Sequence, residues 1–263
     1  MTIADKVFVV TGAGSGIGKQ LALALLARGA HVAAVDLRPE SLQALDHHDH
    51  LSPHAIDITN REAVSALPEQ VIATHGQVDG LINCAGIIQP FAKINDLDFS
   101  DIERVMNVNF YGTLAMTKAF VPHLLTRPDA SLVNVSSMGG FLPVPGQGVY
   151  GASKAAVKLL TEALYAELLG TNVHVSVVFP GATATDITKN SGVAMPKMDD
   201  ASTSSIPMLP ADRAASLIIR GIERNQPQIF TGRDSRLMNL LYRLSPIFAT
   251  KLIAKQMQSL LSR

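Results

Sequence analysis

Four glycines in seven positions near the start of the chain constrain its fold more than any other feature. They belong to Thr11-Gly-Ala-Gly-Ser-Gly-Ile-Gly18, which follows the β-branched run Val7 to Thr11 and precedes an apolar run at helical spacing that ends near Gly29. Glycines allow a strand to turn sharply into a helix, whose N-terminus then offers free N–H groups and a positive dipole end to a pyrophosphate. A glycine cluster alone is a weak signal. Its place between a strand and a helix predicts a dinucleotide site rather than a tight structural turn.

Short apolar runs alternate with helix-like segments along the rest of the chain. We expect strands at residues 31–36, 80–84, 131–135 and 173–179 and in a run ending at Asp57, and helices at residues 40–46, 61–74, 99–125, 149–169 and 211–224. Near-continuous apolar strands separated by helices predict a parallel sheet covered on both faces. The expected fold is α/β: a single-domain, doubly wound, Rossmann-like parallel sheet with an extra C-terminal helical tail.

Residues 1–232 would form the dinucleotide-binding and catalytic domain, and residues 233–263 would form a helical extension of it. Residues from about 186 to 210 would form a substrate loop, with plain disorder as the alternative.

Composition excludes several classes of function. Lysine plus arginine number 22, as do aspartate plus glutamate, and tryptophan is absent, so neither charge nor stacking favours a nucleic-acid partner. The single cysteine, Cys84, allows no intrachain disulfide and fits a reducing compartment. No apolar run approaches the ~18 residues of a membrane helix, and the N-terminus lacks the pattern of a signal peptide. We therefore expect a cytoplasmic protein with no transmembrane segment.

An acidic residue at the end of the second expected strand predicts which dinucleotide binds. Asp36 lies 18 residues beyond Gly18. A carboxylate there can accept hydrogen bonds from both hydroxyls of the adenosine ribose, and it repels a 2′-phosphate. NAD is therefore favoured over NADP. Arg38, two positions further on, is the argument for NADP, because a nearby arginine can pair with that phosphate.

Three polar side chains predict the reacting centre. Tyr150 and Lys154 lie one helical turn apart, and Ser137 follows an expected strand end, where a parallel sheet presents its ligand crevice. Oxidising an alcohol requires a base, and lowering a tyrosine pKa from ~10 to neutrality takes roughly 4 kcal/mol. An adjacent ammonium and an oxidised nicotinamide supply such stabilisation, while the serine hydroxyl holds the substrate oxygen. Alone, the Tyr150–Lys154 pair favours the simpler interpretation of a solvated lysine beside a half-buried tyrosine on an amphipathic helix.

With these residues in one order, the chain resembles the short-chain dehydrogenase/reductases from about residue 5 to residue 231. The resembling elements are residues 11–18, Asn83-Cys-Ala-Gly86, Val108-Asn-Phe-Tyr-Gly112, Asn134-Val-Ser-Ser137, Tyr150-Gly-Ala-Ser-Lys154, and Pro180-Gly181 followed by Thr185. Many members have asparagine where this chain has Cys84, a change from which we expect little effect. Many also end soon after a last strand, whereas here about thirty residues follow Gly232, which argues against their usual C-terminal tetramer contact.

The resemblance implies roles for individual residues. Asn109, Ser137, Tyr150 and Lys154 would form a catalytic tetrad, with Asn109 supporting a water linked to Lys154. Asp57 and Ile58 would meet the adenine, and Thr185 the nicotinamide carboxamide. The full implied cofactor-binding set is Gly12, Ser15, Gly16, Ile17, Gly18, Asp36, Asp57, Ile58, Asn83, Ala85, Gly86, Tyr150, Lys154, Pro180, Gly181, Thr183 and Thr185. Helices 99–125 and 149–169 pair between subunits in similar proteins, so a homodimer or homotetramer is expected.

Apolar residues between Ser137 and Tyr150 indicate the kind of substrate. Met138, Phe141 and Leu142 would line a substrate pocket together with Ser137 and Tyr150. We expect a hydrophobic secondary alcohol or ketone, steroid-like or lipid-like, in a reaction with NAD(H). Two alternatives remain: a catalytically idle dinucleotide-binding sensor, and epimerase or dehydratase chemistry on the same scaffold.

Two further patterns have competing interpretations. Leucines and basic residues interleave in residues 236–263, which fits a helix docked on the domain or on a partner subunit, a flap over the substrate, or a membrane-surface helix. His47-His-Asp-His50 is spaced too tightly for one helical face, so surface histidines are expected there and no metal site.

Overall fold

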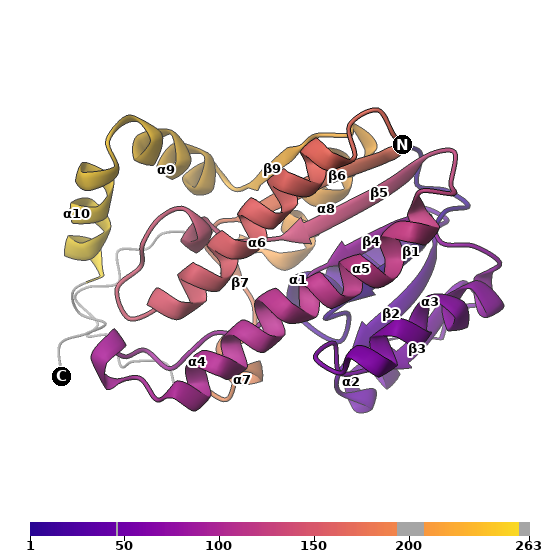
Figure 1. The fold of residues 1–263 in the computed structure, drawn as a ribbon, viewed down its shortest axis with the longest axis horizontal. Helices are drawn as coiled ribbons and strands as arrows, with labels where there is room; N and C mark the ends of the chain where they lie inside the picture. The colour runs from indigo at the N-terminus through magenta and orange to yellow at the C-terminus, as the bar shows by residue number, and fades with distance from the viewer. Residues whose placement is uncertain (46, 194–207, 258–263) are drawn as a thin grey trace.

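Seven parallel strands form the centre of the computed structural model, in the order β3-β2-β1-β4-β5-β6-β9 (Figure 1). The structure describes residues 1–45, 47–193 and 208–257. The strands of the sheet are β1 Val7–Thr11, β2 His31–Asp36, β3 Leu51–Ala55, β4 Gly80–Asn83, β5 Ala130–Val135, β6 Val173–Pro180 and β9 Gln228–Thr231. The order reverses between β1 and β4, and such a switch point opens a crevice at the carboxyl ends of the strands.

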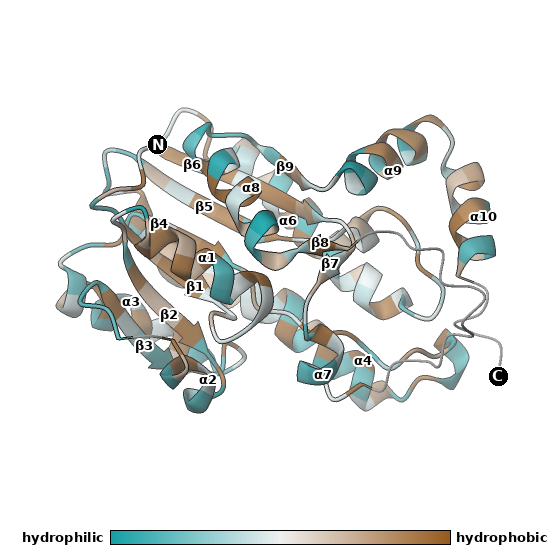
Figure 2. Cartoon of the chain, turned by 180° about the vertical axis from the view of Figure 1, so that it is seen from behind, coloured by the Kyte–Doolittle hydropathy of each residue, from teal (hydrophilic) through white to brown (hydrophobic). Residues whose placement is uncertain are grey.

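Helices cover both faces of this sheet (Figures 1 and 2). They are α1 Gly16–Leu26, α2 Pro39–Gln43, α3 Arg61–His75, α4 Phe99–Met106, α5 Thr113–Leu124, α6 Gly148–Glu167, α7 Ile187–Asn190, α8 Ala211–Glu223, α9 Arg233–Leu244 and α10 Pro246–Gln256. Alternate residues of β1 show the layering, because successive side chains of a strand point to opposite faces. Phe8 and Val10 pack with α1 and α8, whereas Val7 and Val9 pack with α3 and α5. The predicted doubly wound α/β fold with helices on both faces is confirmed.

Local boundaries differ from the predictions in three places. The expected helix over residues 99–125 is α4 and α5 joined by a π-helical turn, Asn107–Gly112. Strand β3 ends at Ala55, so Asp57 lies two residues beyond it, and β4 ends at Asn83, so Cys84 lies just after a strand rather than in one. The shifts at β3 and β4 are typical of element ends, which sequence periodicity locates only approximately.

The C-terminal tail is helical, as predicted. Helices α9 and α10 extend from the end of the molecule where α6 begins (Figure 1). They pack through Ala249 and Ile253 against Leu142. Of the expected substrate loop, the structure describes α7 and the short β7–β8 ladder of Thr183–Ala184 with Leu209–Pro210, and residues 194–207 lie outside the described residues. No helix in the described part of the chain is long and apolar enough to cross a membrane.

Candidate active site

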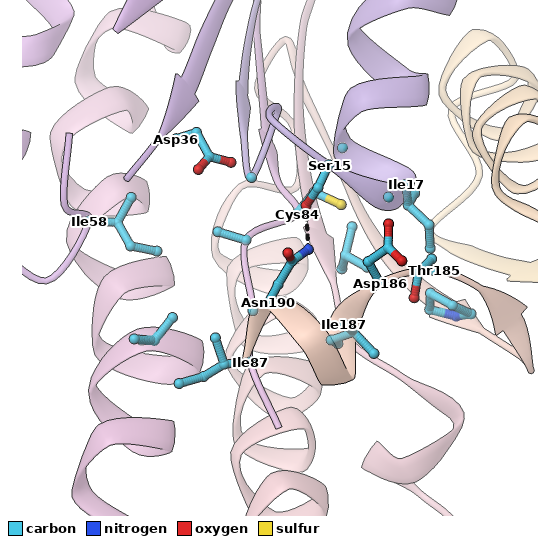
Figure 3. Close-up of a pocket in the computed structure, with 18 of the residues that line it drawn as sticks. Ser15, Ile17, Asp36, Ile58, Cys84, Ile87, Thr185, Asp186, Ile187 and Asn190 are labelled. Atoms are coloured by element: carbon cyan, nitrogen blue, oxygen red, sulfur yellow. Dashed lines mark hydrogen bonds between the residues drawn. The ribbon is translucent and has the colours of Figure 1, made fainter. Parts of the chain in front are cut away.

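A cavity of about 360 Å³ lies at the switch point between β1 and β4 (Figure 3). Most of the residues singled out in the sequence line it, although they are spread over 174 positions of the chain. The lining includes Gly12, Ser15, Gly16, Ile17, Gly18, Asp36, Asp57, Ile58, Ala85, Gly86, Ser137, Tyr150, Lys154, Pro180, Gly181, Thr183 and Thr185. A cavity of this size suits a small-molecule ligand.

The glycine loop forms one wall of the cavity, and close backbone approaches explain its composition. Gly12 has a φ of +69°, and a Cβ there would lie 2.9 Å from Cα of Ala85. A Cβ on Gly18 would collide with the carbonyl of Gly12. The hydroxyl of Thr11 accepts the N–H groups of Cys84 and Ala85 at 3.0 and 3.1 Å, which holds the segment after β4 against the loop. The N-terminus of α1 therefore faces an open cradle of the kind that takes a pyrophosphate.

Asp36 lies at the end of β2 and is 9% exposed. Its carboxylate accepts the N–H of Gly14 at 2.9 Å and the N–H of Arg38 at 3.1 Å. The Nε of Arg38 lies 3.9 Å from the same carboxylate, and its Nη1 donates to Oδ1 of Asn190 at 3.1 Å. The amide of Asn190 also donates to the hydroxyl of Ser15 at 2.9 Å, so α7 bridges the two sides of the cavity (Figure 3). These contacts fix the Asp36 carboxylate at the wall of the cavity.

Lys154 and Tyr150 face the other end of the cavity from the first turns of α6. The ammonium of Lys154 donates to the carbonyl of Val135, the last residue of β5, at 2.9 Å. Burial lowers the pKa of Lys154 to about 8. Burial raises the pKa of Tyr150, and a hydrogen bond with Ser137 opposes that rise. At neutral pH the pair is therefore an ammonium beside a protonated phenol, with the Ser137 hydroxyl next to it.

Asn109 does not line the cavity and lies completely buried behind it, in the π-helical turn. Its Oδ1 accepts the N–H of Ile87 at 2.9 Å, and its Nδ2 donates to the Ile87 carbonyl and to the Ser153 hydroxyl, both at 2.9 Å. A Cβ on Gly86 would lie 3.0 Å from Nζ of Lys154 and 3.3 Å from Oδ1 of Asn109. The two side chains thus border the same narrow space at Gly86, where the resemblance implied a water between them.

Four residues expected at the site do not line this cavity. The Asn83 side chain is buried and turned away, with its Nδ2 donating to Asn134 at 2.8 Å. Met138, Phe141 and Leu142 do not line the cavity either and pack in one cluster with α9 and α10, where Leu142 is fully buried and the other two are half-buried. Their order after Ser137 indicated proximity to the site but not the face that each side chain would take.

Two residues that the sequence did not single out hold the site together. Asn190 bridges Ser15 and Arg38, as described above. Gln89 is completely buried, and its Oε1 accepts the N–H groups of Val149 and Tyr150 at 2.8 and 2.9 Å. Both contacts join segments far apart in sequence, and no local pattern marks either residue.

Cys84 and the histidines carry no sign of catalysis. Burial raises the pKa of the Cys84 thiol to about 11, so the thiol is neutral at pH 7, and it lines the cavity rather than packing inside a strand. His50 stacks on His31 with ring centroids 4.0 Å apart. Within the described ranges, no group of three histidine, cysteine or acidic residues is arranged to hold a metal ion.

Known proteins share both the sequence and the fold. Residues 6–195 match the family model described as short chain dehydrogenase. The chain is 35% identical over 264 residues to SadH of Mycobacterium tuberculosis, a protein provisionally named as an oxidoreductase, and the match covers 95% of this chain and 94% of that protein.

Two solved structures extend the comparison to dinucleotide complexes. A short chain dehydrogenase of Burkholderia cenocepacia in complex with NADP is 28% identical, with a TM-score of 0.83 over 96% of this chain and 99% of that chain. The 3-ketoacyl-(acyl-carrier-protein) reductase of Brucella melitensis, complexed with NADH, is 25% identical, with a TM-score of 0.78 over 88% of this chain and 99% of that chain. The match to the family model and the similarity to SadH cover most of the chain, and the two dinucleotide complexes share its fold. The chain therefore belongs to the short-chain dehydrogenase/reductase family of oxidoreductases.

Proposed function

We propose that the protein is an NAD-dependent dehydrogenase or reductase that acts on a hydrophobic secondary alcohol or ketone. The observation that carries the proposal is the meeting of Ser137, Tyr150 and Lys154 in one cavity with the glycine loop and Asp36. The bound nicotinamide would supply the hydride acceptor or donor. The side chains of this chain would supply proton transfer and positioning.

Tyr150 is the proposed acid and base, because its phenol is the titratable group beside Ser137. Burial keeps the phenol protonated in the structure, which suits proton donation to a carbonyl oxygen during reduction. Alcohol oxidation requires the phenolate. The ammonium of Lys154, fixed by the Val135 carbonyl, favours that charged form, and so does a positively charged nicotinamide ring.

Ser137 and Asn109 are proposed to position the reacting groups. The Ser137 hydroxyl would donate to the substrate oxygen and hold it beside the phenol. Asn109 fixes the backbone at Ile87 and borders Lys154, so it would support a water that exchanges protons with the ammonium. Neither role requires a metal ion.

Asp36 supports NAD as the cofactor, because its carboxylate offers acceptors to the ribose hydroxyls and repels a 2′-phosphate. Arg38 is already engaged by Asp36 and Asn190. The relatives differ in this respect, since one of the two complexes contains NADP and the other NADH.

The apolar cluster after Ser137 supports a hydrophobic substrate. Met138 and Phe141 are half-buried against α9 and α10, so apolar surface begins directly beside the proposed reacting centre. A related reductase is named for a ketoacyl substrate, which is a ketone on an apolar chain.

The experiment is a panel of hydrophobic secondary alcohols and ketones, assayed with NAD(H) and NADP(H) side by side for the wild type and for Tyr150→Phe. We expect Tyr150→Phe to abolish turnover, by at least about a hundredfold, while NADH binding remains within about twofold. Tyr165→Phe, on the same helix with its side chain 43% exposed, is the matched control and keeps full activity.

Unchanged turnover in Tyr150→Phe would remove Tyr150 from the mechanism. Activity confined to small polar sugars would refute the substrate class, and product formation without stoichiometric NADH would favour epimerase or dehydratase chemistry. NADH binding with no turnover of any panel member would favour an idle sensor.

We also propose a homodimer or homotetramer that pairs through α4, α5 and α6. Phe99 is 79% exposed on α4 and Leu159 is 67% exposed on α6, and exposed apolar surface of this kind marks subunit contacts. Analytical ultracentrifugation tests the proposal, and a monomer at micromolar concentration would refute it.

A further inference from the structure

Five large apolar side chains on α9 and α10 face away from the protein core. Their exposed fractions are 64% for Leu237, 55% for Leu240, 76% for Leu244, 68% for Ile247 and 56% for Phe248. Leu237, Leu240 and Leu244 recur every three or four residues along α9, and Ile247 and Phe248 lie in the first turn of α10, directly after the corner between the two helices. We call these five exposed side chains the tail face. Both helices extend beyond the sheet and carry hydrophobic residues there (Figure 2).

The tail face is not what attaches these helices to the domain. A different set of side chains does so: Ala249 and Ile253 are buried against Leu142, with Met238, Leu241 and Tyr242 packed around them. The rings of Phe141 and Tyr242 lie 6.4 Å apart in the same cluster. The two helices therefore have a second apolar face in addition to the one that docks, and folding alone does not account for it.

Positive charge surrounds the tail face. Residues 233–256 contain five basic side chains, Arg233, Arg236, Arg243, Lys251 and Lys255, all exposed, and a single acidic one, Asp234. The Asp234 carboxylate is turned toward the domain, where it accepts the N–H of Ala182 at 2.9 Å. Among the residues that the structure describes, none of the five cations forms an ion pair. The whole chain has no net charge, so this positive patch is local.

We propose that the tail face binds an anionic lipid surface, with the five apolar side chains entering the boundary between headgroups and acyl chains. Helices that lie in a membrane interface combine an apolar face with lysine and arginine, and an anionic lipid surface attracts basic residues that lie close to it. A second copy of this chain fits the tail face less well than an anionic lipid surface does. A two-fold contact through the tail face would bring the five basic side chains of one copy close to the five of the other, and these like charges repel. The tail face belongs to α9 and α10 alone, so its binding to lipid does not depend on the chemistry of the cavity.

The test is co-sedimentation of the full-length protein with vesicles of phosphatidylcholine alone and of phosphatidylcholine mixed with phosphatidylglycerol. We expect partition into the mixed vesicles that is at least about tenfold stronger than into the neutral ones and that weakens as salt is added. The double variant Leu240→Asp/Leu244→Asp should bind the mixed vesicles at least about tenfold more weakly than the wild type does. The double variant Arg236→Gln/Arg243→Gln should bind them about tenfold more weakly. Both variants should keep the melting temperature of the wild type, because all four side chains are exposed. Leu169→Asp, 63% exposed and outside the tail, is the control and should bind as the wild type does.

Three results would overturn the proposal. One is no partition into the mixed vesicles at low salt. Another is that the wild type partitions equally into both kinds of vesicle and that the Leu240→Asp/Leu244→Asp variant partitions to the same extent as the wild type. The third is a dimer in solution that this double variant dissociates, since the tail face would then be covered by a second copy.

Discussion

Replacing Asp36 by alanine tests the cofactor assignment most directly. The carboxylate is almost fully buried at the wall of the cavity, and the N–H groups of Gly14 and Arg38 hold it in place. If it accepts both ribose hydroxyls of NAD, the substitution removes two hydrogen bonds to a charged acceptor. It also removes the like charge that a 2′-phosphate would meet, and it releases the guanidinium of Arg38, which lies 3.9 Å away.

The two dinucleotides should therefore respond in opposite directions. Hydrogen bonds to charged groups contribute about 1.5 kcal/mol each at the low end, so the loss of two costs about 3 kcal/mol and raises the Kd for NADH about 150-fold. Pairing of the released Arg38 with the 2′-phosphate should lower the Kd for NADPH about tenfold, or ~1.4 kcal/mol.

Isothermal titration calorimetry with NADH and NADPH measures both constants, and it suits a chain that has no tryptophan to report binding by fluorescence. Asp212→Ala, which removes an exposed carboxylate from the first turn of α8, is the control for a general change in charge. Equal weakening of both dinucleotides would mean that the substitution only disturbs the glycine loop. An unchanged Kd for NADH would refute the role of Asp36.

Three further predictions concern residues that support the site or the fold. Gln89→Ala should lower the free energy of unfolding by about 1–2 kcal/mol, measured by chemical denaturation, because two N–H groups of α6 lose their acceptor. Asn190→Ala should speed the release of NADH in stopped-flow experiments about tenfold, because the bridge to Ser15 is lost, and an unchanged rate would show that the bridge does not restrain the cofactor. Burial lowers the pKa of His54 and His75 below the ordinary value of 6.5, so the unfolded chain binds more protons and the protein should lose stability as pH falls below about 6.5. Denaturation at pH 8 and pH 5.5 measures that loss, which the double variant His54→Gln/His75→Gln should reduce.

Much of the fold was predictable because its signals are local. The strands of a sheet buried on both faces consist of apolar runs, and the turn after β1 requires glycines at particular positions, as the close approaches at Gly12 and Gly18 explain. The spacing of Tyr150 and Lys154 and the place of Ser137 after a strand end also predicted that the three would lie together, and all three line the cavity. The topology of a parallel sheet then brings such strand ends to one edge, and the cavity lies there.

Residues that were expected at the site but do not line the cavity share a different feature. Phe141 and Leu142 follow Ser137 closely, but the direction of each side chain depends on α9 and α10, which lie about a hundred residues further along the sequence. Asn83 ends a strand at the site, yet its amide is directed toward Asn134 on the neighbouring strand. Neighbourhood in sequence predicts that a residue lies near a site, whereas its orientation depends on tertiary contacts that local patterns do not encode.

The first turn of α6 shows why such contacts are needed at a site of this kind. Tyr150 and Lys154 face the cavity, so apolar packing cannot hold this side of the helix in place. Helix N-termini have unpaired N–H groups, and here no side chain of the preceding Gln147 caps them. Gln89 caps them from nearly sixty residues away and donates to the carbonyl of Gly146 at 3.1 Å, while the ammonium of Lys154 is fixed by the backbone of β5. Polar contacts to backbone atoms thus replace the missing apolar packing, and the position of the phenol depends on Gln89, which is buried outside the cavity.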